Sequence, residues 1–277
     1  MIQQKPPLLP PSILDAFQSQ VGFDFALHAF LVCRSGSATH GTKLSTSDDD
    51  FFAVVVPPAE RLIGLEGFDG WEPTGLGIDV RVYSLRKYIG LLLKNNPNVL
   101  ETLWLRQADY CPVHTSWEFY KLILLRDHFS SLHAYHAFTG YAYDQLQRLE
   151  TSRYSRNMGE KRKLLVDQFG YDPKNAAHLI RLFRSGIEFV QTGQLTVYRP
   201  DRAELMDIKQ GKWSLAQVKT EGERLAAVMK TTKEGSPLSA EPDRESAQQY
   251  LINVTELRSF PSNVPPILMS LSQGPGL

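Results

Sequence analysis

The chain has 277 residues, of which 30 are basic and 30 acidic, so its formal net charge at pH 7 is zero. Its 2 cysteines are too few for a disulfide framework or a cysteine-based metal site. No stretch approaches the roughly 18 consecutive apolar residues that a transmembrane helix needs, and no signal-peptide pattern opens the chain. We therefore expect a cytoplasmic protein without a membrane segment, long enough for two domains.

The first part of the chain combines predicted strands with helices. Residues 12–21 have apolar positions at helical spacing. The segments "FALHAFLVCRS" (25–35) and "FFAVVV" (51–56) are apolar runs that end at Gly or Pro, which is typical of central strands covered on both faces. Apolar and polar residues alternate in "GIDVRVY" (77–83), which predicts a half-buried strand, and a helix is predicted over 85–93.

From about residue 116 the pattern changes to long helical periods. Amphipathic helices are predicted over 116–149 and 175–193. The predicted fold is therefore α/β of the α+β kind, with a small mixed β-sheet flanked by helices in residues 1–115. A mainly helical domain follows over 116–230, and residues 231–277 are expected to be a linker and a loosely ordered C-terminal segment.

Three consecutive aspartates precede the predicted strand 51–56. If the strand has already begun there, Asp48 and Asp50 point to one face and Asp49 to the other. Two such carboxylates, about 6–7 Å apart between Cα atoms, can reach a shared ion. Asp79, on the polar face of another strand, is the candidate for a third ligand. From the residues alone, a solvated turn before a strand explains the aspartate run equally well.

Oxygen ligands of this kind favour Mg²⁺ or Mn²⁺ over zinc. Gly36 and Ser37 directly follow the predicted strand that ends near Arg34. A glycine turn with exposed backbone N–H groups can bind phosphate oxygens, although such a turn is usually only the end of a strand. Phosphate beside a metal-binding carboxylate cluster is the arrangement needed to displace pyrophosphate from a nucleoside triphosphate.

Four blocks of the sequence resemble one family of enzymes. They are "GSATHGTKLSTSDDDFFAV", "DVRVYSLRKYIGLLLKNNPNVLETLW", "GYAYDQLQRL" and "AAHLIRLFRSGIEFVQTGQLTV". In this order they are similar to the predicted nucleotidyltransferases of the RlaP type, which belong to the DNA polymerase β superfamily and are associated with RNA repair. The similarity spans roughly residues 31–230.

The resemblance implies a role for each motif residue. Gly36 and Ser37 would contact the triphosphate, Asp48 and Asp50 would bind the metal, and Asp79 would be the third carboxylate and assist deprotonation of the acceptor. Residues 1–115 would be the catalytic domain.

The resemblance also implies the activity, a magnesium- or manganese-dependent transfer of a nucleoside monophosphate from a bound nucleoside triphosphate, such as ATP, to a hydroxyl acceptor. The expected acceptor is an RNA end. Two alternatives stay open at this point. One is a non-catalytic nucleotide- or RNA-binding module on the same fold, and the other is nucleotidylation of a protein or a small molecule.

Overall fold

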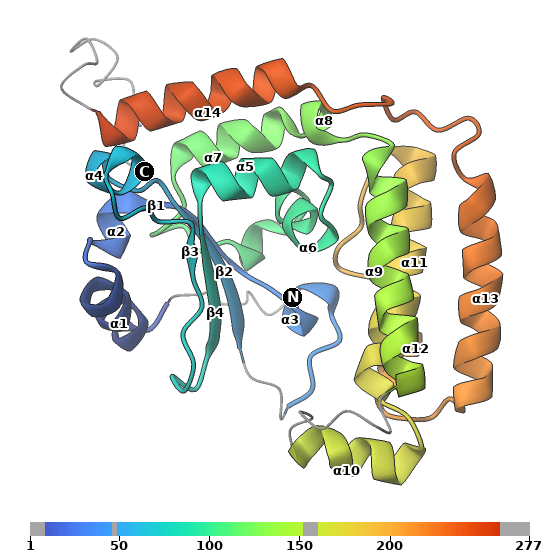
Figure 1. Ribbon diagram of the computed structural model, residues 1–277. Helices are drawn as coiled ribbons and strands as arrows, with labels where there is room; N and C mark the ends of the chain where they lie inside the picture. Colours follow the sequence, from blue (N-terminus) through green and yellow to red (C-terminus); the bar gives the residue numbers. More distant parts are fainter. Residues whose placement is uncertain (1–8, 46–48, 152–159, 261–277) are drawn as a thin grey trace.

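The structure is a computed structural model that describes residues 9–45, 49–151 and 160–260. A β-sheet with helices on both faces forms one half of the molecule, and a bundle of long helices forms the other (Figure 1). The predicted fold class, a small mixed sheet flanked by helices and followed by mainly helical residues, is confirmed. The division of the chain into units at residue 115 stays a prediction.

The sheet has four strands in the order β1-β2-β4-β3. The pairs β1–β2 and β3–β4 are antiparallel, whereas β2 and β4 run parallel, so the sheet is mixed. A parallel pair needs a crossover connection, and here the crossover contains one short helix and the edge strand β3. The strands are β1 (Ala29–Arg34), β2 (Asp50–Val55), β3 (Gly70–Trp71) and β4 (Asp79–Ser84).

The burial of the strands follows their residue patterns. Strands β1 and β2 are apolar and buried on both faces, as predicted, except for Arg34 at the end of β1 and Asp50 at the start of β2, which are partly exposed. In β4, Val80 and Val82 are buried whereas Asp79 and Arg81 are exposed, which confirms the predicted alternation. The strand predicted over 25–35 is shorter, because residues 25–28 form a helical turn that begins at the capping residue Asp24.

Helices cover each face of the sheet with a separate hydrophobic cluster. On one face, α1 (Pro11–Val21) places Phe17 among four aromatic rings, each 5.1–5.9 Å away between centroids in edge-to-face contact. Burying a side chain of this size contributes about 1.5–3 kcal/mol. On the other face, the cluster includes Phe52 of the sheet and Phe183 of the helical bundle, so one continuous core joins the two halves.

The helical bundle is organised around α11 (Pro173–Thr192), which packs against α9, α12 and α13. Helices α11 and α9 approach closely at Gly186, which has no side chain. A Cβ added there would lie only 2.7 Å from the Cβ of Phe138. Gly193 ends α11 in the left-handed conformation, as its position in the sequence predicts. The other bundle helices are α9 (His133–Thr151), α12 (Arg202–Lys209) and α13 (Leu215–Thr231).

The single helix predicted over 116–149 is broken into three in the structure. The buried side chain of Asn95 explains the second break, because its amide donates to the Phe129 carbonyl at 2.6 Å and its oxygen accepts from the Ser131 N–H at 3.0 Å. These bonds satisfy backbone groups that would otherwise pair within a continuous helix. The three helices are α7 (Trp117–Leu124), α8 (Arg126–Phe129) and α9.

The C-terminal segment differs from the expected loose tail. Residues Arg244–Ser259 form helix α14, which runs along α5 (Leu85–Leu93) and α8 (Figure 1). Its contacts are specific, since the Tyr250 hydroxyl donates to the Glu118 carbonyl at 2.6 Å. At its end, Arg258 donates to the carbonyls of Leu27 and Ala29. The expectation of a loosely ordered segment is therefore wrong for α14.

The remaining helices are short, except α10. No helix within the described residues is long and apolar enough to cross a membrane. These helices are α2 (Phe25–His28), α3 (Ser37–His40), α4 (Ala59–Ile63), α6 (Pro97–Leu100), α10 (Glu160–Phe169) and the 3₁₀ turns Glu101–Leu103 and Gln107–Asp109.

Candidate functional site

The candidate site begins where β1 ends and the chain turns into α3. The Ser35 N–H donates to the Asp50 carbonyl at 2.9 Å, which holds the turn against the start of β2. Gly36 follows with φ 65° and ψ −142°. A Cβ at this position would lie 2.4 Å from Oδ2 of Asp50, so the close approach of backbone and carboxylate requires glycine. Ser37 then begins α3.

Two of the predicted carboxylates are register partners. Asp50 in β2 lies directly opposite Asp79 in β4, on adjacent parallel strands about 4.8 Å apart. Both side chains share the face of Phe52 and Tyr83, whose rings are in contact at 5.4 Å between centroids. This face of the sheet looks toward the helical bundle.

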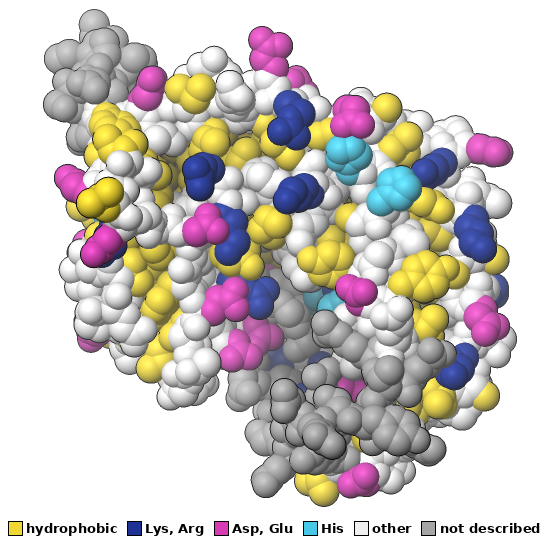
Figure 2. Space-filling model, viewed as in Figure 1, with side chains coloured by type: hydrophobic (Ala, Val, Ile, Leu, Met, Phe, Trp, Pro, Cys, Tyr) yellow, Lys and Arg dark blue, Asp and Glu magenta, His cyan; other side chains and the backbone are white. Residues whose placement is uncertain are grey.

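Asp79 is exposed and Asp50 is partly exposed, so solvent ions and ligands can reach them. Figure 2 shows acidic side chains gathered in a hollow of the surface between the sheet and the helical bundle. Figure 1 places α3 between the same two halves. The starts of strands β2 and β4, which carry the two carboxylates, are therefore open toward the bundle.

The other two aspartate predictions have different outcomes. Asp48 lies outside the described residues, so the predicted set of three carboxylates is not tested. Within the described residues, no group of three or more His, Cys, Asp or Glu side chains is arranged to hold a metal ion. Asp49 is exposed and forms an ion pair with Lys43 at 2.5 Å. Strand β2 begins only at Asp50, so the predicted alternation of Asp48, Asp49 and Asp50 between two faces stays a prediction.

A buried polar network connects α3 to the bundle. His40, the last residue of α3, lies 2.8 Å from Glu101, whose other oxygen pairs with Arg181 of α11. Burial lowers the pKa of His40, and the Arg181 charge lowers it further, so this imidazole is neutral at pH 7. Burial alone would raise the pKa of Glu101, but Arg181 and His40 hold it well below its usual range. The network fixes the C-terminal end of α3.

A second contact comes from helix α12. The Nζ of Lys209 donates to the carbonyl of Thr42 at 2.7 Å, just after α3. The backbone N–H of Arg199 donates to the carbonyl of His40 at 3.2 Å. Neither contact was predicted from the sequence, because residues 42 and 209 are 167 positions apart. In the sequence, Lys209 looks like the other charged residues of α12, and no local pattern singles it out.

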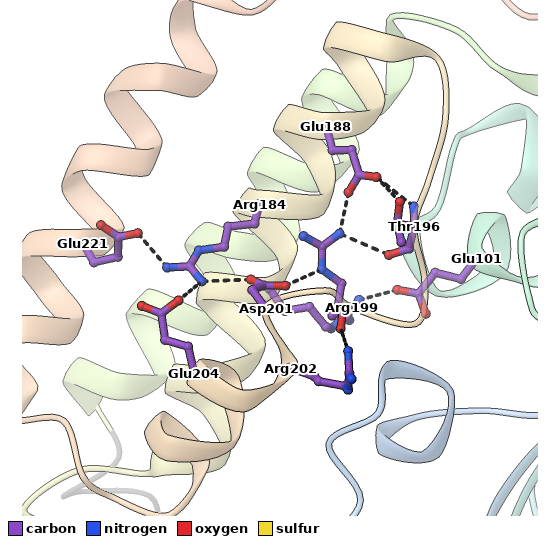
Figure 3. Close-up of polar contacts among 10 residues, drawn as sticks. Glu101, Arg184, Glu188, Thr196, Arg199, Asp201, Arg202, Glu204 and Glu221 are labelled. Carbon is purple, nitrogen blue, oxygen red and sulfur yellow. Dashed lines mark hydrogen bonds and ion pairs between the residues drawn. The ribbon is translucent and has the colours of Figure 1, made fainter. Parts of the chain in front are cut away.

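Two arginines of the bundle, Arg184 and Arg199, are paired within it, as Figure 3 shows. Arg184 contacts three carboxylates, at 2.6–3.0 Å. Arg199 contacts two, those of Glu188 and Asp201, at 2.5 and 2.9 Å. The charge of Arg184 is therefore neutralised within the bundle. A groove of about 540 Å³ lies beside this network, and its arginines, Arg184, Arg199 and Arg224, are paired with carboxylates.

Comparison with known proteins identifies the family. The sequence model of the RNA repair pathway DNA polymerase beta family, RlaP, matches residues 14–253. The protein belongs to the RlaP family. Membership indicates a nucleotidyltransferase of the DNA polymerase β type.

Two further comparisons complete these findings. Among solved structures, the chain is similar to a nucleotidyltransferase-like protein from Exiguobacterium sibiricum 255-15, with 10% sequence identity and a TM-score of 0.26. The alignment covers 90% of this chain and 79% of that one. No curated protein matches the chain.

Proposed function

We propose that this protein is a metal-dependent nucleotidyltransferase that moves a nucleoside monophosphate from a nucleoside triphosphate to the hydroxyl of an RNA end. The observation that carries the proposal is the direct pairing of Asp50 with Asp79 beside the Gly36 turn. Two carboxylates on one face of adjacent strands, next to a backbone turn that approaches one of them closely, suit a metal-bound polyphosphate.

The residues fit a divalent cation of the hard type. Asp50 and Asp79 offer only oxygen atoms, which Mg²⁺ and Mn²⁺ prefer. We assign Asp48 as a further ligand, on the strength of its position two residues before Asp50. A bound divalent ion would neutralise the charge that develops on the phosphates and keep neighbouring carboxylates ionised.

The residues of the chain would act as follows. Backbone N–H groups at Gly36 and Ser37 bind phosphate oxygens and orient the triphosphate. Asp79 accepts the proton of the acceptor hydroxyl. A bond forms between the acceptor oxygen and the α-phosphorus, the bond from that phosphorus to the bridging oxygen breaks, and pyrophosphate leaves with the electron pair.

The proposal is tested with α-labelled nucleotides. Each NTP is incubated with Mg²⁺ or Mn²⁺ and with RNA, a protein mixture or small hydroxyl compounds, and the label is located by electrophoresis and chromatography. Asp50→Asn and Asp79→Asn are each expected to lower the transfer rate by about 10²-fold or more. Asp49→Asn is the matched control, because Asp49 pairs with Lys43 instead, and it should stay within about twofold of wild type.

Each result has a distinct meaning. Label on RNA supports the proposed acceptor, whereas label on protein or a small molecule replaces that acceptor and keeps the reaction. Nucleotide binding without any transfer would indicate a non-catalytic binding module. Full activity of both Asp50→Asn and Asp79→Asn would refute the site.

A further inference from the structure

Helix α12 brings an ammonium group to the loop that follows α3. Lys209 is the last residue of α12, and its Nζ is held 2.7 Å from the Thr42 carbonyl. Thr42 is itself buried, and it lies five residues after Ser37. The side chain of Lys209 is partly buried in this contact. A cation of the bundle is thus fixed beside the segment that leads from the Gly36 turn.

The charges around Lys209 do not balance it locally. Among the described residues, no carboxylate lies within 4 Å of its Nζ. Burial lowers the pKa of Lys209, nearby Lys174 lowers it further, and the charge of Asp50 acts in the opposite direction. Lys212, only three residues later, shows the usual alternative, an ion pair with Asp207 at 2.6 Å.

This environment suits an anion. A lysine ammonium has three N–H donors, and Thr42 accepts one of them. Holding Lys209 near Lys174 costs electrostatic energy, which an anion placed between them would remove. Because the Thr42 N–H donates to the Ser37 carbonyl at 2.9 Å, the segment that holds Lys209 is bonded directly to the first residue of α3, next to the Gly36 turn. A polyphosphate extending from the Gly36 turn meets these conditions.

We propose that Lys209 binds the terminal phosphates of the nucleotide from the helical side, with Lys174 contributing charge at longer range. A nucleoside triphosphate would then bridge the ends of β2 and β4 and the bundle, whereas a monophosphate lacks the terminal phosphates that Lys209 contacts. The site therefore selects nucleotides by the length of their phosphate chain. This inference rests on the proposed function, which supplies the nucleotide.

Binding measurements test the assignment. Isothermal titration calorimetry with Mg²⁺ present gives the dissociation constants of ATP, AMP and inorganic tripolyphosphate for the full chain. Lys209→Gln removes the charge but keeps an N–H donor for the Thr42 carbonyl. It is expected to weaken ATP and tripolyphosphate at least tenfold, which equals about 1.4 kcal/mol, and to change AMP less than twofold. Lys209→Arg should retain most of the affinity, and Lys212→Gln should match wild type.

The exposed Lys174 provides a second variant in case Lys209→Gln does not fold. Lys174→Gln is expected to weaken ATP by about threefold and to leave AMP unchanged, as suits a charge acting at longer range. Wild-type affinity for ATP in a folded Lys209→Gln protein would overturn the inference, and so would an equal loss for AMP and ATP. If only Lys174→Gln can be measured, unchanged ATP binding in that variant would overturn it.

The inference and the proposed function fail in different ways. Weaker ATP binding in Asp50→Asn together with unchanged binding in Lys209→Gln would keep the proposed function and remove the role of Lys209. Weaker ATP binding in Lys209→Gln, with no acceptor ever labelled, would keep the phosphate contact and remove the transfer reaction.

Discussion

Replacing Glu101 by glutamine tests the buried network that fixes α3. Glu101 and Arg181 are almost fully buried, with side-chain exposures of 9% and 5%. The substitution keeps the size of the side chain but leaves the Arg181 charge without a counter-charge. Arg181 already has one buried nitrogen, Nη2, without a hydrogen-bond partner within the described residues, so it has no substitute there. Breaking such a buried pair costs about 3–5 kcal/mol of unfolding free energy.

Urea unfolding, followed by fluorescence and far-UV circular dichroism, measures this cost. Coincidence of the two probes checks that the transition is two-state, which a chain of this length need not satisfy. The double variant Glu101→Gln/Arg181→Met removes the stranded charge and should recover part of the loss, with a coupling energy of about 1–3 kcal/mol. Glu66→Gln is the matched control, because Glu66 pairs with Arg61 at the surface with 84% side-chain exposure and should change stability by less than about 1 kcal/mol.

Two results would refute the reasoning. If Glu101→Gln lost no more stability than Glu66→Gln, the network would not stabilise the fold. If the double variant lost the sum of the single losses, Glu101 and Arg181 would not be coupled, and their proximity in the structure would carry no energetic weight.

Three further predictions concern the glycine turn, acid stability and the C-terminal helix. Gly36→Ala should displace the Asp50 carboxylate and lower nucleotidyl transfer, measured with labelled NTP, at least tenfold. The control Gly90→Ala should retain activity, because its added Cβ has no atoms within 4 Å. Folding lowers the pKa of His40 below its ordinary 6.5, so the unfolded chain binds more protons and the folded state should lose stability as the pH drops below about 6.5. In thermal melts over this pH range, the melting temperature of His40→Gln should fall less than that of wild type. Arg258→Met removes two donors to backbone carbonyls and should cost about 1–3 kcal/mol in urea unfolding, and an unchanged midpoint would show that the end of α14 does not stabilise the fold.

Local patterns in the sequence predicted the elements that position the carboxylates. The apolar run before Pro57 became β2, and the alternation around Val80 became β4. Because strand side chains alternate, these patterns also assigned Asp50 and Asp79 to faces. In the structure the two strands are neighbours, and their register brings the two carboxylates directly opposite each other.

Other features depend on contacts between distant residues. The break before α9 follows from the side chain of Asn95, and no Gly or Pro marks it in the sequence. Helix α14 buries only Ala247 and Val254, so its apolar pattern is weak beside the linker-like residues that precede it. Its order comes from bonds such as that of Tyr250 to the Glu118 carbonyl, 132 positions away.

The distribution of charge along the chain is a weak guide to the site, and the structure explains why. Residues 121–230 contain 18 basic and 12 acidic side chains, an excess that could indicate a phosphate-binding surface. Much of this charge is used within the bundle, where Arg184 and Arg199 hold helices together through carboxylates. Lys209, the cation proposed to bind phosphate, differs from these arginines in where its side chain points. It reaches out of the bundle to the Thr42 carbonyl beside α3. Pairing, which only the fold determines, separates structural charges from those available to a ligand.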